Sequence, residues 1–413
     1  MSPSYSTWCA NILTTGSIFM IFGKMTPLRI TSYTYTTCLG AGLNANWDAI
    51  QAGRSGLQPC TFFRINDLDT WVGEVAGLDQ ALPPSLAEFD CRNNRLSWLA
   101  LQQDGFITRA QSAIARYGAA RVGIFIGTST SGIHQTELAY FANQDPLPAW
   151  YQYRTTHNVS SVATFVRAAL GASGPAIAIS TACSSSAKVF ASAQRALNTG
   201  LCDAAIVGGV DSLCLTTLYG FHALQLISPR KCQPFDSQRS GISIGEAGGF
   251  ALLEKTGDSN LCLLGYGESG DAYHMSSPHP EGAGAQLAMG AALRKAGLDT
   301  SAIDYINLHG TGTQTNDSAE ARAVQQLFGN TTPASSTKGW TGHTLGAAGI
   351  VEACIALEAI NYHYLPQSLH LQDVDEGMDI ALLKHPETRP VARVLSNSFG
   401  FGGSNCSLIL GSH

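Results

Sequence analysis

Short apolar runs alternate with segments of helical periodicity along most of the chain. Two of these runs, 122–126 and 176–180, have the uninterrupted apolar character of buried parallel strands. After the second run, apolar residues recur at helical spacing over 187–196, the stretch 198–200 ends the helix, and 204–207 is the next apolar run. The pattern predicts a strand–helix–strand unit in this part of the chain.

The same alternation resumes after about residue 255. We expect strands at 261–264, 305–308, 394–395 and 407–410, and helices at 285–296, 318–328 and 347–360. Alternation in both portions predicts an α/β protein made of two similarly built halves, 27–257 and 258–413. A strand at 28–35 begins the first half, and irregular insertions are expected at 145–156 and 228–239.

Composition supports a large folded body. The chain has 413 residues, of which 45% are hydrophobic and only 13% charged, so it can bury the core of two fused halves. The net charge of −6 gives no general attraction to phosphate and argues against a nucleic-acid partner. An acidic partner would therefore have to meet a local basic patch.

Cysteine usage and the N-terminus bear on location. The chain has 11 cysteines, an odd number without Cys-x-x-Cys pairs, which predicts reduced thiols and a cytoplasmic protein. The apolar stretch 17–22 is too short to span a bilayer and lacks the flanks of a signal peptide. We expect residues 1–26 to be a dispensable extension, and no other stretch suggests a membrane span.

A cysteine lies at a predicted strand-to-helix corner, in the run Thr-Ala-Cys-Ser-Ser-Ser over 181–186. The free N–H groups and positive dipole end of a helix N-terminus favour a thiolate, so we expect the pKa of Cys183 to fall below the ~8.5 of a free cysteine. Its small neighbours leave the sulfur uncovered. Local sequence alone leaves an ordinary buried core cysteine as the more frequent case.

Two histidines lie in loops of small residues. His309 begins His-Gly-Thr-Gly-Thr, and His343 lies in Gly-His-Thr-Leu-Gly-Ala-Ala-Gly. A lone histidine is more often structural than catalytic, but the adjacent glycines give each ring access to a ligand. A third loop, Asn-Ser-Phe-Gly-Phe-Gly-Gly-Ser-Asn at 397–405, lacks the strand-then-helix context of a dinucleotide site, so we reject that interpretation.

These four motifs, in this order and with Lys338 before the second histidine, resemble elongating β-ketoacyl-acyl-carrier-protein synthases from about residue 27 to the C-terminus. The resemblance implies a thiolase-like fold, with two similar halves in five alternating αβαβα layers, normally as a dimer. It implies no metal ion and no bound cofactor, because the substrates arrive on the phosphopantetheine of an acyl carrier protein.

The resemblance also implies a division of chemical roles. Cys183 would accept the acyl group, and a carbanion from decarboxylation of a malonyl thioester would then attack it. His309 and His343 would donate N–H groups to the enolate oxygen, where losing one donor costs roughly 3 to 4 kcal/mol of barrier.

Further roles come from the glycine loop of the same motif set. The backbone N–H groups of Cys183 and Phe401 would form the oxyanion hole, and Gly400 and Gly402 would let that backbone approach the sulfur. Phe399 and Phe401 would act as a gate beside the cysteine. In a sequence without these motifs, Phe399 and Phe401 would be interpreted as ordinary core aromatics.

Three charged residues are expected to support the site. The resemblance places Lys338 and Glu320 in an ion pair that orients the histidines. Asp317 and Glu320 share a helix face, so Asp317 would cap the helix while Glu320 turns inward. Without the motif, Lys338 and Glu320 are better interpreted as solvated surface charges.

The acyl pocket is expected to differ from that of typical family members. Thr130 matches a position that often carries a larger aliphatic residue facing the acyl chain, so a smaller polar side chain would lengthen or reshape the pocket. Tyr151 and Tyr153 lie in the segment that would reach across a dimer. Tyrosines there hint at a rigid or unsaturated chain, such as an aryl or polyene intermediate.

Carrier proteins are acidic, so docking requires cations near the entrance. Arg92 and Arg95 resemble the docking residues of the family, and Arg230 and Lys231 are further candidates in the irregular loop. Gln225 stands where the family often has an arginine, so carrier recognition is expected to be shifted or weakened.

Three other assignments compete. A thiolase needs a second catalytic cysteine, but Cys406 lies in a strand-like run, and an initiating synthase would lack His343. A non-catalytic, chain-length-determining subunit would lack the nucleophile, although the catalytic subunit could require such a partner. Homodimer and heterodimer, and fatty-acid and polyketide or aryl-polyene pathways, stay open.

Overall fold

The computed structural model describes residues 23–63, 68–142 and 145–412. Of the expected dispensable extension, 1–26, residues 1–22 lie outside the described residues.

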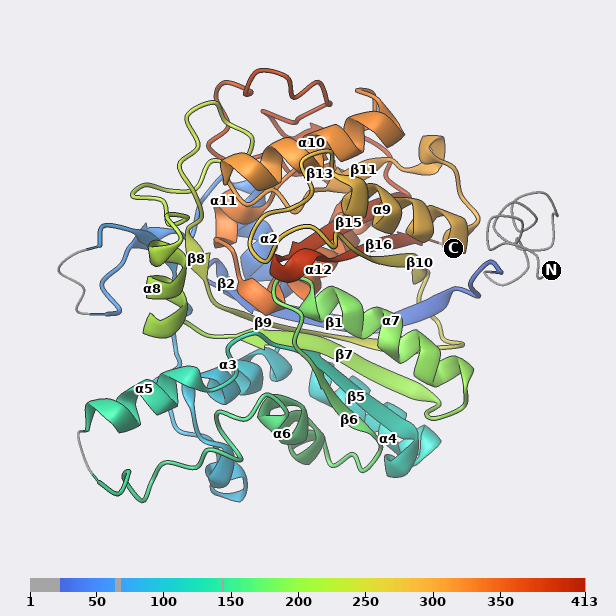
Figure 1. Cartoon of the computed structure of the whole chain (residues 1–413). Coiled ribbons are helices and arrows are strands. Elements are labelled where there is room, and N and C mark those ends of the chain that lie inside the picture. The colour runs from blue at the N-terminus through green and yellow to red at the C-terminus, as the bar shows by residue number, and fades with distance from the viewer. Residues whose placement is uncertain (1–22, 64–67, 143–144, 413) are drawn as a thin grey trace, which may run out of the picture.

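An eleven-stranded sheet runs through the described part of the chain (Figure 1). Its strands are β1 (Leu28–Thr37), β2 (Gly40–Ala41), β5 (Val122–Gly127), β6 (Ala176–Ile179), β7 (Ala204–Asp211), β9 (Ala247–Glu254), β10 (Leu261–Gly270), β11 (Tyr305–Asn307), β12 (Ala334–Ser335), β15 (Arg393–Gly400) and β16 (Ser404–Ser412). β2 pairs only with β1, and the others follow the order β12-β11-β15-β16-β10-β1-β9-β7-β5-β6.

The sheet consists of two arms joined along a short seam. β1 and β10 pair at only two positions, Leu28 with Leu263 and Arg29 with Cys262. In one arm β6, β5 and β7 are parallel to each other, and β9 and β1 continue the arm with antiparallel pairing. In the other arm β12, β11 and β15 are parallel, and β16 and β10 continue it with antiparallel pairing. The repeated pattern confirms two similarly built halves.

Helices complete the layers. They are α2 (Leu43–Gln51), α3 (Arg92–Leu101), α4 (Phe106–Tyr117), α5 (Ile133–Phe141), α6 (Ser161–Leu170), α7 (Ser185–Asn198), α8 (Leu215–Ala223), α9 (Ala283–Ala296), α10 (Gln314–Phe328), α11 (Lys338–Thr341) and α12 (Ala348–Tyr362). Two short sheets lie beside them, β3 (Gln58–Pro59) with β4 (Trp71–Gly73) and β8 (Ile244–Gly245), and β13 (Tyr364–Leu365) with β14 (Glu387–Thr388).

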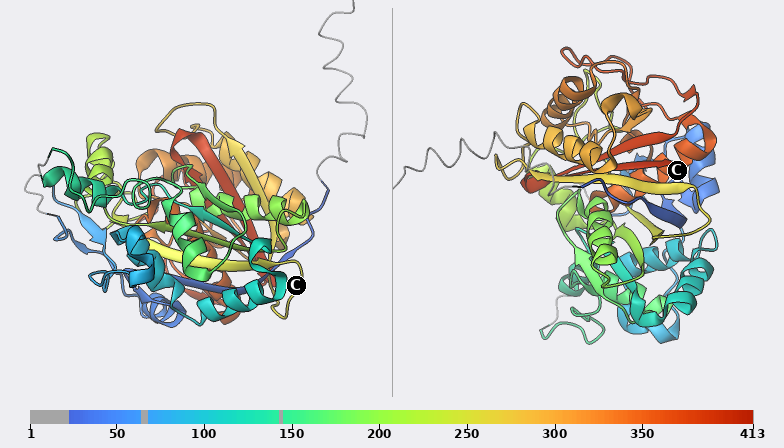
Figure 2. Two further views of the ribbon diagram at one scale, coloured as in Figure 1. Left: turned by 90° about the horizontal axis from the view of Figure 1, so that it is seen from below. Right: turned by 90° about the vertical axis from the view of Figure 1, so that its right-hand side faces the viewer.

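α7 and α12 pack on each other and on strands of both arms, so they form a middle layer. α9 covers the outer face of one arm with α10 beside it, and α3, α4 and α6 cover the outer face of the other (Figure 1). The right-hand view of Figure 2 shows the orange helices on one side of the strands and the cyan and green helices on the other. The five alternating layers of the thiolase-like fold are confirmed.

The middle layer explains one unusual stretch of sequence. Leu345–Tyr362 is long and apolar enough, by length and composition, to cross a membrane, but 89% of this window is buried inside the fold. A helix enclosed between the two arms of the sheet is apolar on most sides, which is the character of α12 apart from Glu352 and Glu358.

One strand prediction needs correction. The run 176–180 was expected to be a buried strand, but β6 is the free edge of the sheet, and Ile177 is 39% exposed. An apolar run has the same sequence pattern whether a neighbouring element or a second chain covers it. The insertions at 145–156 and 228–239 are irregular, as predicted.

Candidate active site

Cys183 lies in the turn that connects the end of β6 to the N-terminus of α7. The hydroxyl of Ser185 holds this turn, because it accepts from the backbone N–H of Thr181 (2.9 Å) and donates to the carbonyl of Ala182 (2.6 Å). Ala182 has a φ of 52°, in the left-handed region that a residue with a Cβ rarely adopts. The cysteine is therefore held at the predicted corner in a tightly determined conformation.

The sulfur and both predicted imidazoles meet in one cavity. Nε2 of His343 lies 3.0 Å from Sγ of Cys183, and the rings of His309 and His343 have centroids 5.3 Å apart. One ligand-type atom from each of the three residues lies within 4.8 Å of the others. All three line the same cavity, so three segments far apart in the sequence converge on one point.

The hydrogen bonds assign the imidazole tautomers. The backbone N–H of Leu345 donates to Nδ1 of His343 (3.1 Å), and the ammonium of Lys338 lies 3.2 Å from Nδ1 of His309. Each Nδ1 therefore accepts, which leaves the proton on Nε2. Burial, followed by the charge of Lys338, holds the pKa of both histidines well below the usual range.

Both rings are thus neutral and present an N–H to the cavity. The spacing of the sulfur and one ring nitrogen from each histidine also suits a metal ion. Because a protonated Nε2 offers no lone pair, this arrangement is built to donate hydrogen bonds to a developing oxyanion.

The expectation of a lowered cysteine pKa is wrong. Burial raises the pKa of Cys183 to about 11, although Lys338 and a hydrogen bond from the backbone N–H of Phe401 act in the opposite direction. The side chain is only 5% exposed, so the loss of hydration outweighs these two contributions. The resting nucleophile is a thiol.

The predicted ion pair between Lys338 and Glu320 is also wrong. Nζ of Lys338 binds Oε1 of Glu352 at 2.5 Å and the backbone carbonyl of His309. Glu352 lies on α12 and burial raises its pKa to about 7. Sequence reasoning missed this residue, although a carboxylate in an otherwise apolar helix must find a partner when buried, which is the signal that could have found it.

Glu320 acts on the backbone of the histidine loop. Its two carboxylate oxygens accept from the N–H groups of His309 and Gly310, each at 2.8 Å, and Nδ2 of Asn397 donates to Oε1 at 3.1 Å. The side chain turns inward as predicted, and burial raises its pKa to about 7. Its role is to hold the loop that carries His309.

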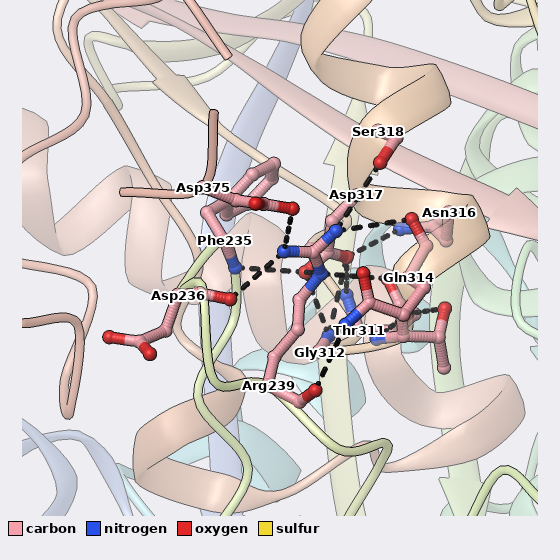
Figure 3. A network of polar contacts seen from close by, with 12 residues as sticks. Phe235, Asp236, Arg239, Thr311, Gly312, Gln314, Asn316, Asp317, Ser318 and Asp375 are labelled. Atoms are coloured by element: carbon pink, nitrogen blue, oxygen red, sulfur yellow. Dashed lines mark hydrogen bonds and ion pairs between the residues drawn. The ribbon is translucent and has the colours of Figure 1, made fainter. Parts of the chain in front are cut away.

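Asp317 does not cap α10 as expected. Figure 3 shows its carboxylate inside a network in front of the helix, where it accepts from the N–H groups of Thr311 (2.9 Å) and Phe235 (2.8 Å). Arg239 lies 3.7 Å from the same carboxylate and pairs with Asp375 at 2.6 Å. The network ties the irregular loop 228–239 to the His309 loop.

The glycine loop approaches the sulfur as predicted. A Cβ on Gly400 would lie 2.7 Å from the carbonyl of Thr181 and 3.3 Å from the backbone N of Cys183, so only glycine fits without displacement. The backbone N–H of Phe401 hydrogen-bonds the sulfur. The backbone N–H of Phe401 thus lies beside the sulfur, and the assignment of Cys183 and Phe401 to an oxyanion hole stays a prediction.

The two phenylalanines line the cavity together with Gly400 and Gly402. The ring of Phe399 lies 6.1 Å from that of His309, and the ring of Phe401 lies 5.5 Å from that of Phe221 on α8. Phe401 is only partly buried, so part of its surface reaches solvent. The position suits the predicted gate.

The predicted acyl-pocket residues do not line this cavity. Thr130 is buried, and its hydroxyl donates to Asp211 at 2.8 Å, so its predicted role in shaping the acyl pocket stays a prediction. The hydroxyl of Tyr151 lies 2.8 Å from that of Thr136, and Tyr153 is 55% exposed. The prediction that these tyrosines reach across a dimer stays a prediction.

Asp211 was missed by sequence reasoning. This buried carboxylate ends β7 and accepts from Thr128, from Thr130 and from the backbone N–H of Gly346. It therefore fixes the loop after β5 against the loop that carries His343.

Two predicted docking residues are engaged inside the protein. Arg92 pairs with Glu246, its side chain only 12% exposed, and Arg95 pairs with Asp90 at 2.7 Å. The assignment of Arg92 to carrier docking is wrong, because its side chain is held by Glu246. Arg95 is held by Asp90. Arg230 is exposed and Lys231 partly exposed.

A cysteine nucleophile facing two neutral imidazole donors, at the centre of a thiolase-like fold, defines an acyltransferase of the condensing class. The chain belongs to the beta-ketoacyl synthase family: residues 25–259 match the N-terminal domain of beta-ketoacyl synthase and residues 261–372 match its C-terminal domain. It is thus an acyltransferase that forms carbon–carbon bonds, and the thiolase alternative is set aside.

Curated relatives agree with this family. The chain is 32% identical to 3-oxoacyl-[acyl-carrier-protein] synthase 2 of Vibrio harveyi over 403 residues, covering 90% of this chain and 95% of the relative. It is 32% identical to the synthase 2 of Coxiella burnetii over 414 residues, covering 92% and 97%.

Solved structures extend the comparison. The structure of the ketosynthase ApeO in complex with its chain length factor ApeC from Xenorhabdus doucetiae contains a chain 38% identical to this one, with a TM-score of 0.88 and coverage of 94% of this chain and 98% of that chain. A beta-ketoacyl synthase from Burkholderia phymatum is 26% identical, with a TM-score of 0.84 and coverage of 94% and 100%.

Proposed function

We propose that this chain is the catalytic subunit of a β-ketoacyl-acyl-carrier-protein synthase that extends an acyl chain by two carbons. The observation that carries the proposal is the 3.0 Å approach of His343 Nε2 to the sulfur of Cys183, with His309 in the same cavity. The substrates arrive on the phosphopantetheine arm of a carrier protein, and the reaction needs no bound cofactor or metal ion.

In the first half-reaction the sulfur of Cys183 attacks the carbonyl carbon of the acyl thioester. The backbone N–H groups of Cys183 and Phe401 stabilise the tetrahedral oxyanion. The bond between carbonyl carbon and pantetheine sulfur then breaks, and the proton of the Cys183 thiol ends on the departing pantetheine thiol.

In the second half-reaction a malonyl thioester loses carbon dioxide, and the electron pair of the broken bond forms an enolate. The Nε2–H groups of His309 and His343 donate to the enolate oxygen. Its carbon attacks the acyl thioester on Cys183, the carbon–sulfur bond breaks, and the released thiolate takes a proton from solvent.

A partner subunit completes the proposal. β6 is a free sheet edge, and exposed apolar side chains gather on α5 and the segment after it, which we call the α5 patch: Leu138, Tyr140, Phe141, Leu147, Trp150, Tyr153 and Val159. Free edges and contiguous apolar patches are typical of interfaces. The similar ketosynthase ApeO is in complex with a chain length factor, and we propose a related, non-catalytic partner here.

This partnership favours a specialised fatty-acid or polyketide pathway over housekeeping elongation. An aryl-polyene chain is one product that fits the predicted rigid acyl group. The identity of the acyl chain can be determined from the mass of the acyl group trapped on Cys183.

The test is intact-mass measurement after incubation with acylated carrier protein, followed by malonyl carrier protein. Wild type should gain one acyl group on Cys183 and then release a product two carbons longer. Cys183→Ala should do neither, whereas Cys60→Ala, which removes a thiol outside the cavity, should behave as wild type. Condensation by Cys183→Ala would overturn the proposal.

A further inference from the structure

Two neighbouring helices, α5 and α8, bury very little of their own surface. In α5 only Ala139 is buried, and in α8 only Leu218. The two helices pack on each other and lie at the left of Figure 1. Helices with so few buried residues belong to the least stable part of a fold, so their positions depend on specific contacts.

The carboxylate of Glu137, on α5, closes the N-terminus of α8. It accepts from the backbone N–H groups of Leu215 (3.0 Å) and Thr216 (2.6 Å) and from the hydroxyl of Thr216 (2.7 Å). These N–H groups begin α8 and have no acceptor within their own helix, so a carboxylate from another helix serves as their cap. The side chain of Glu137 is only 10% exposed, which shields the contacts from water.

The cap is a charged one. Burial raises the pKa of Glu137, but hydrogen bonds from His134, Thr216 and Leu215 outweigh it and hold the pKa at about 2. An ionised carboxylate at this position attracts the positive end of the α8 dipole. Glu137 is therefore an ionic link between α5 and α8.

The other end of α8 reaches the active site. Phe221, in the last turn of the helix, lines the cavity around Cys183. Its ring centroid lies 5.5 Å from that of Phe401, whose backbone N–H hydrogen-bonds the sulfur. Because α8 has only nine residues, a displacement of its N-terminus also moves Phe221 and changes the packing of the predicted gate.

The opposite side of α5 faces outward. Leu138, Tyr140 and Phe141 are 43%, 68% and 69% exposed and belong to the α5 patch, which is part of the proposed partner interface. Glu137 adjoins these residues in sequence, but its carboxylate turns toward α8. A partner that covers the α5 patch would fix α5 in place, and through Glu137 it would fix α8.

We propose that Glu137 is a positioning residue that couples assembly with the partner subunit to the gate of the active site. By holding the first turn of α8 on α5, it keeps Phe221 packed against Phe401 when the partner covers the α5 patch. The inference rests on the proposed function for the partner and the reaction, and it adds a route from the interface to the sulfur.

Two cysteines report on the two ends of α8. Cys214 is buried directly before the helix, its sulfur 2.9 Å from the hydroxyl of Thr217, and Cys183 lies at the gate. In the full-length protein assembled with its chain length factor, Glu137→Ala should speed iodoacetamide labelling of both about threefold to thirtyfold, the range that loss of a helix cap corresponds to. Cys354, buried in the core, should stay unlabelled over the same period, which excludes general unfolding.

The response to the partner tests the coupling itself. Addition of the chain length factor to wild type should slow labelling of Cys214 and Cys183 at least about fivefold, and this response should be lost in Glu137→Ala although the complex still forms. Glu137→Gln keeps an acceptor for Thr216 and should recover part of the response. Glu254→Ala removes a carboxylate of similar burial from β9, and as the matched control it should respond as wild type does.

Kinetics and a second variant establish the order of the steps. The assembled Glu137→Ala should condense with a kcat about tenfold lower and a carrier KM changed less than about twofold, because the gate is disturbed and docking is not. Phe221→Leu removes the ring contact beyond α8. It should therefore speed labelling of Cys183 and leave Cys214 as in wild type.

The outcomes separate the two proposals. If wild type condenses but Glu137→Ala labels and responds to the partner as wild type does, or Glu254→Ala shows the same change, the coupling is overturned and the function stands. If wild type neither acylates Cys183 nor condenses, the function falls, and labelling of Cys214 with and without the partner still decides the coupling. Should Glu137→Ala fail to fold, judged by its melting temperature, Glu137→Gln and Phe221→Leu decide.

Discussion

At Cys183, hydration and charge act in opposite directions. The helix N-terminus and Lys338 favour a thiolate, but enclosure of the sulfur raises its pKa to about 11. Residue-level reasoning from sequence detected the favourable contributions, because motifs reveal neighbours. It could not weigh the desolvation, because burial depends on the phenylalanines and histidines that fold over the sulfur from the other half of the chain.

The balance predicts how the thiol titrates. The rate of alkylation of Cys183 should keep rising through pH 10, whereas the rate for a free cysteine with a pKa of about 8.5 levels off near pH 9.5. Lys338→Met removes a charge that lowers this pKa, so alkylation at pH 9 should become slower. Peptide mass spectrometry after iodoacetamide pulses measures the rate at Cys183, with Cys60 as the reference thiol. A plateau below pH 9 would contradict the raised pKa.

The histidines should separate the two half-reactions. His309→Ala removes one of two donors to the enolate, so decarboxylation of malonyl carrier protein should fall about 10²-fold to 10³-fold. Acylation of Cys183 should fall much less, because its oxyanion is held by backbone N–H groups. Carbon dioxide release and acyl-enzyme mass report the two steps, and an equal loss in both would refute the division of roles.

At the scale of elements, the loop that carries His309 depends on buried carboxylates from α10. Glu320 is neutral below pH 7 in the folded protein but ionises near pH 4.5 when unfolded. Between these values the folded state binds more protons, so the contribution of Glu320 to stability falls as pH rises.

This linkage can be measured against a variant. The difference in the free energy of unfolding between wild type and Glu320→Gln should decrease from pH 4.5 to pH 7 and stay level above pH 7. Urea titrations across this range give the difference, and Glu281→Gln, at an exposed position on a neighbouring loop, is the control. A difference that grows with pH would show that the carboxyl is charged at lower pH than its burial implies.

Elements were more predictable than their partners. Apolar periodicity located β1, β5, β6, β7 and α7 in the first half and the longer strands and helices of the second half, but it missed β9 and the helices α2 to α6 and α8. The partner of Lys338 was assigned to Glu320 and is Glu352, since periodicity places a residue on a helix but not opposite a particular charge. Similarly, Asp317 was expected to cap its own helix, yet it binds the backbone of Phe235, 82 residues earlier in the chain.

At the scale of the whole molecule, β6 and the α5 patch leave an unfinished surface. The same apolar run that predicted a buried strand lies at an edge of the sheet, so the edge can pair with a second chain. Tyr153 belongs to this surface, and Tyr151 lies two residues before it. The acyl pocket is expected to form between two subunits.

A charge at the free edge should therefore prevent assembly. Ile177 is 39% exposed at the centre of β6, so Ile177→Lys costs the single chain little but places an ammonium in the proposed interface. We expect the melting temperature of the isolated chain to stay within a few degrees, while association with the partner subunit weakens at least about tenfold. Light scattering during size-exclusion chromatography measures the assembly. Leu287→Lys, at a position 58% exposed on α9, is the matched control and should assemble as wild type; assembly of Ile177→Lys at wild-type strength would show that β6 is not the joining edge.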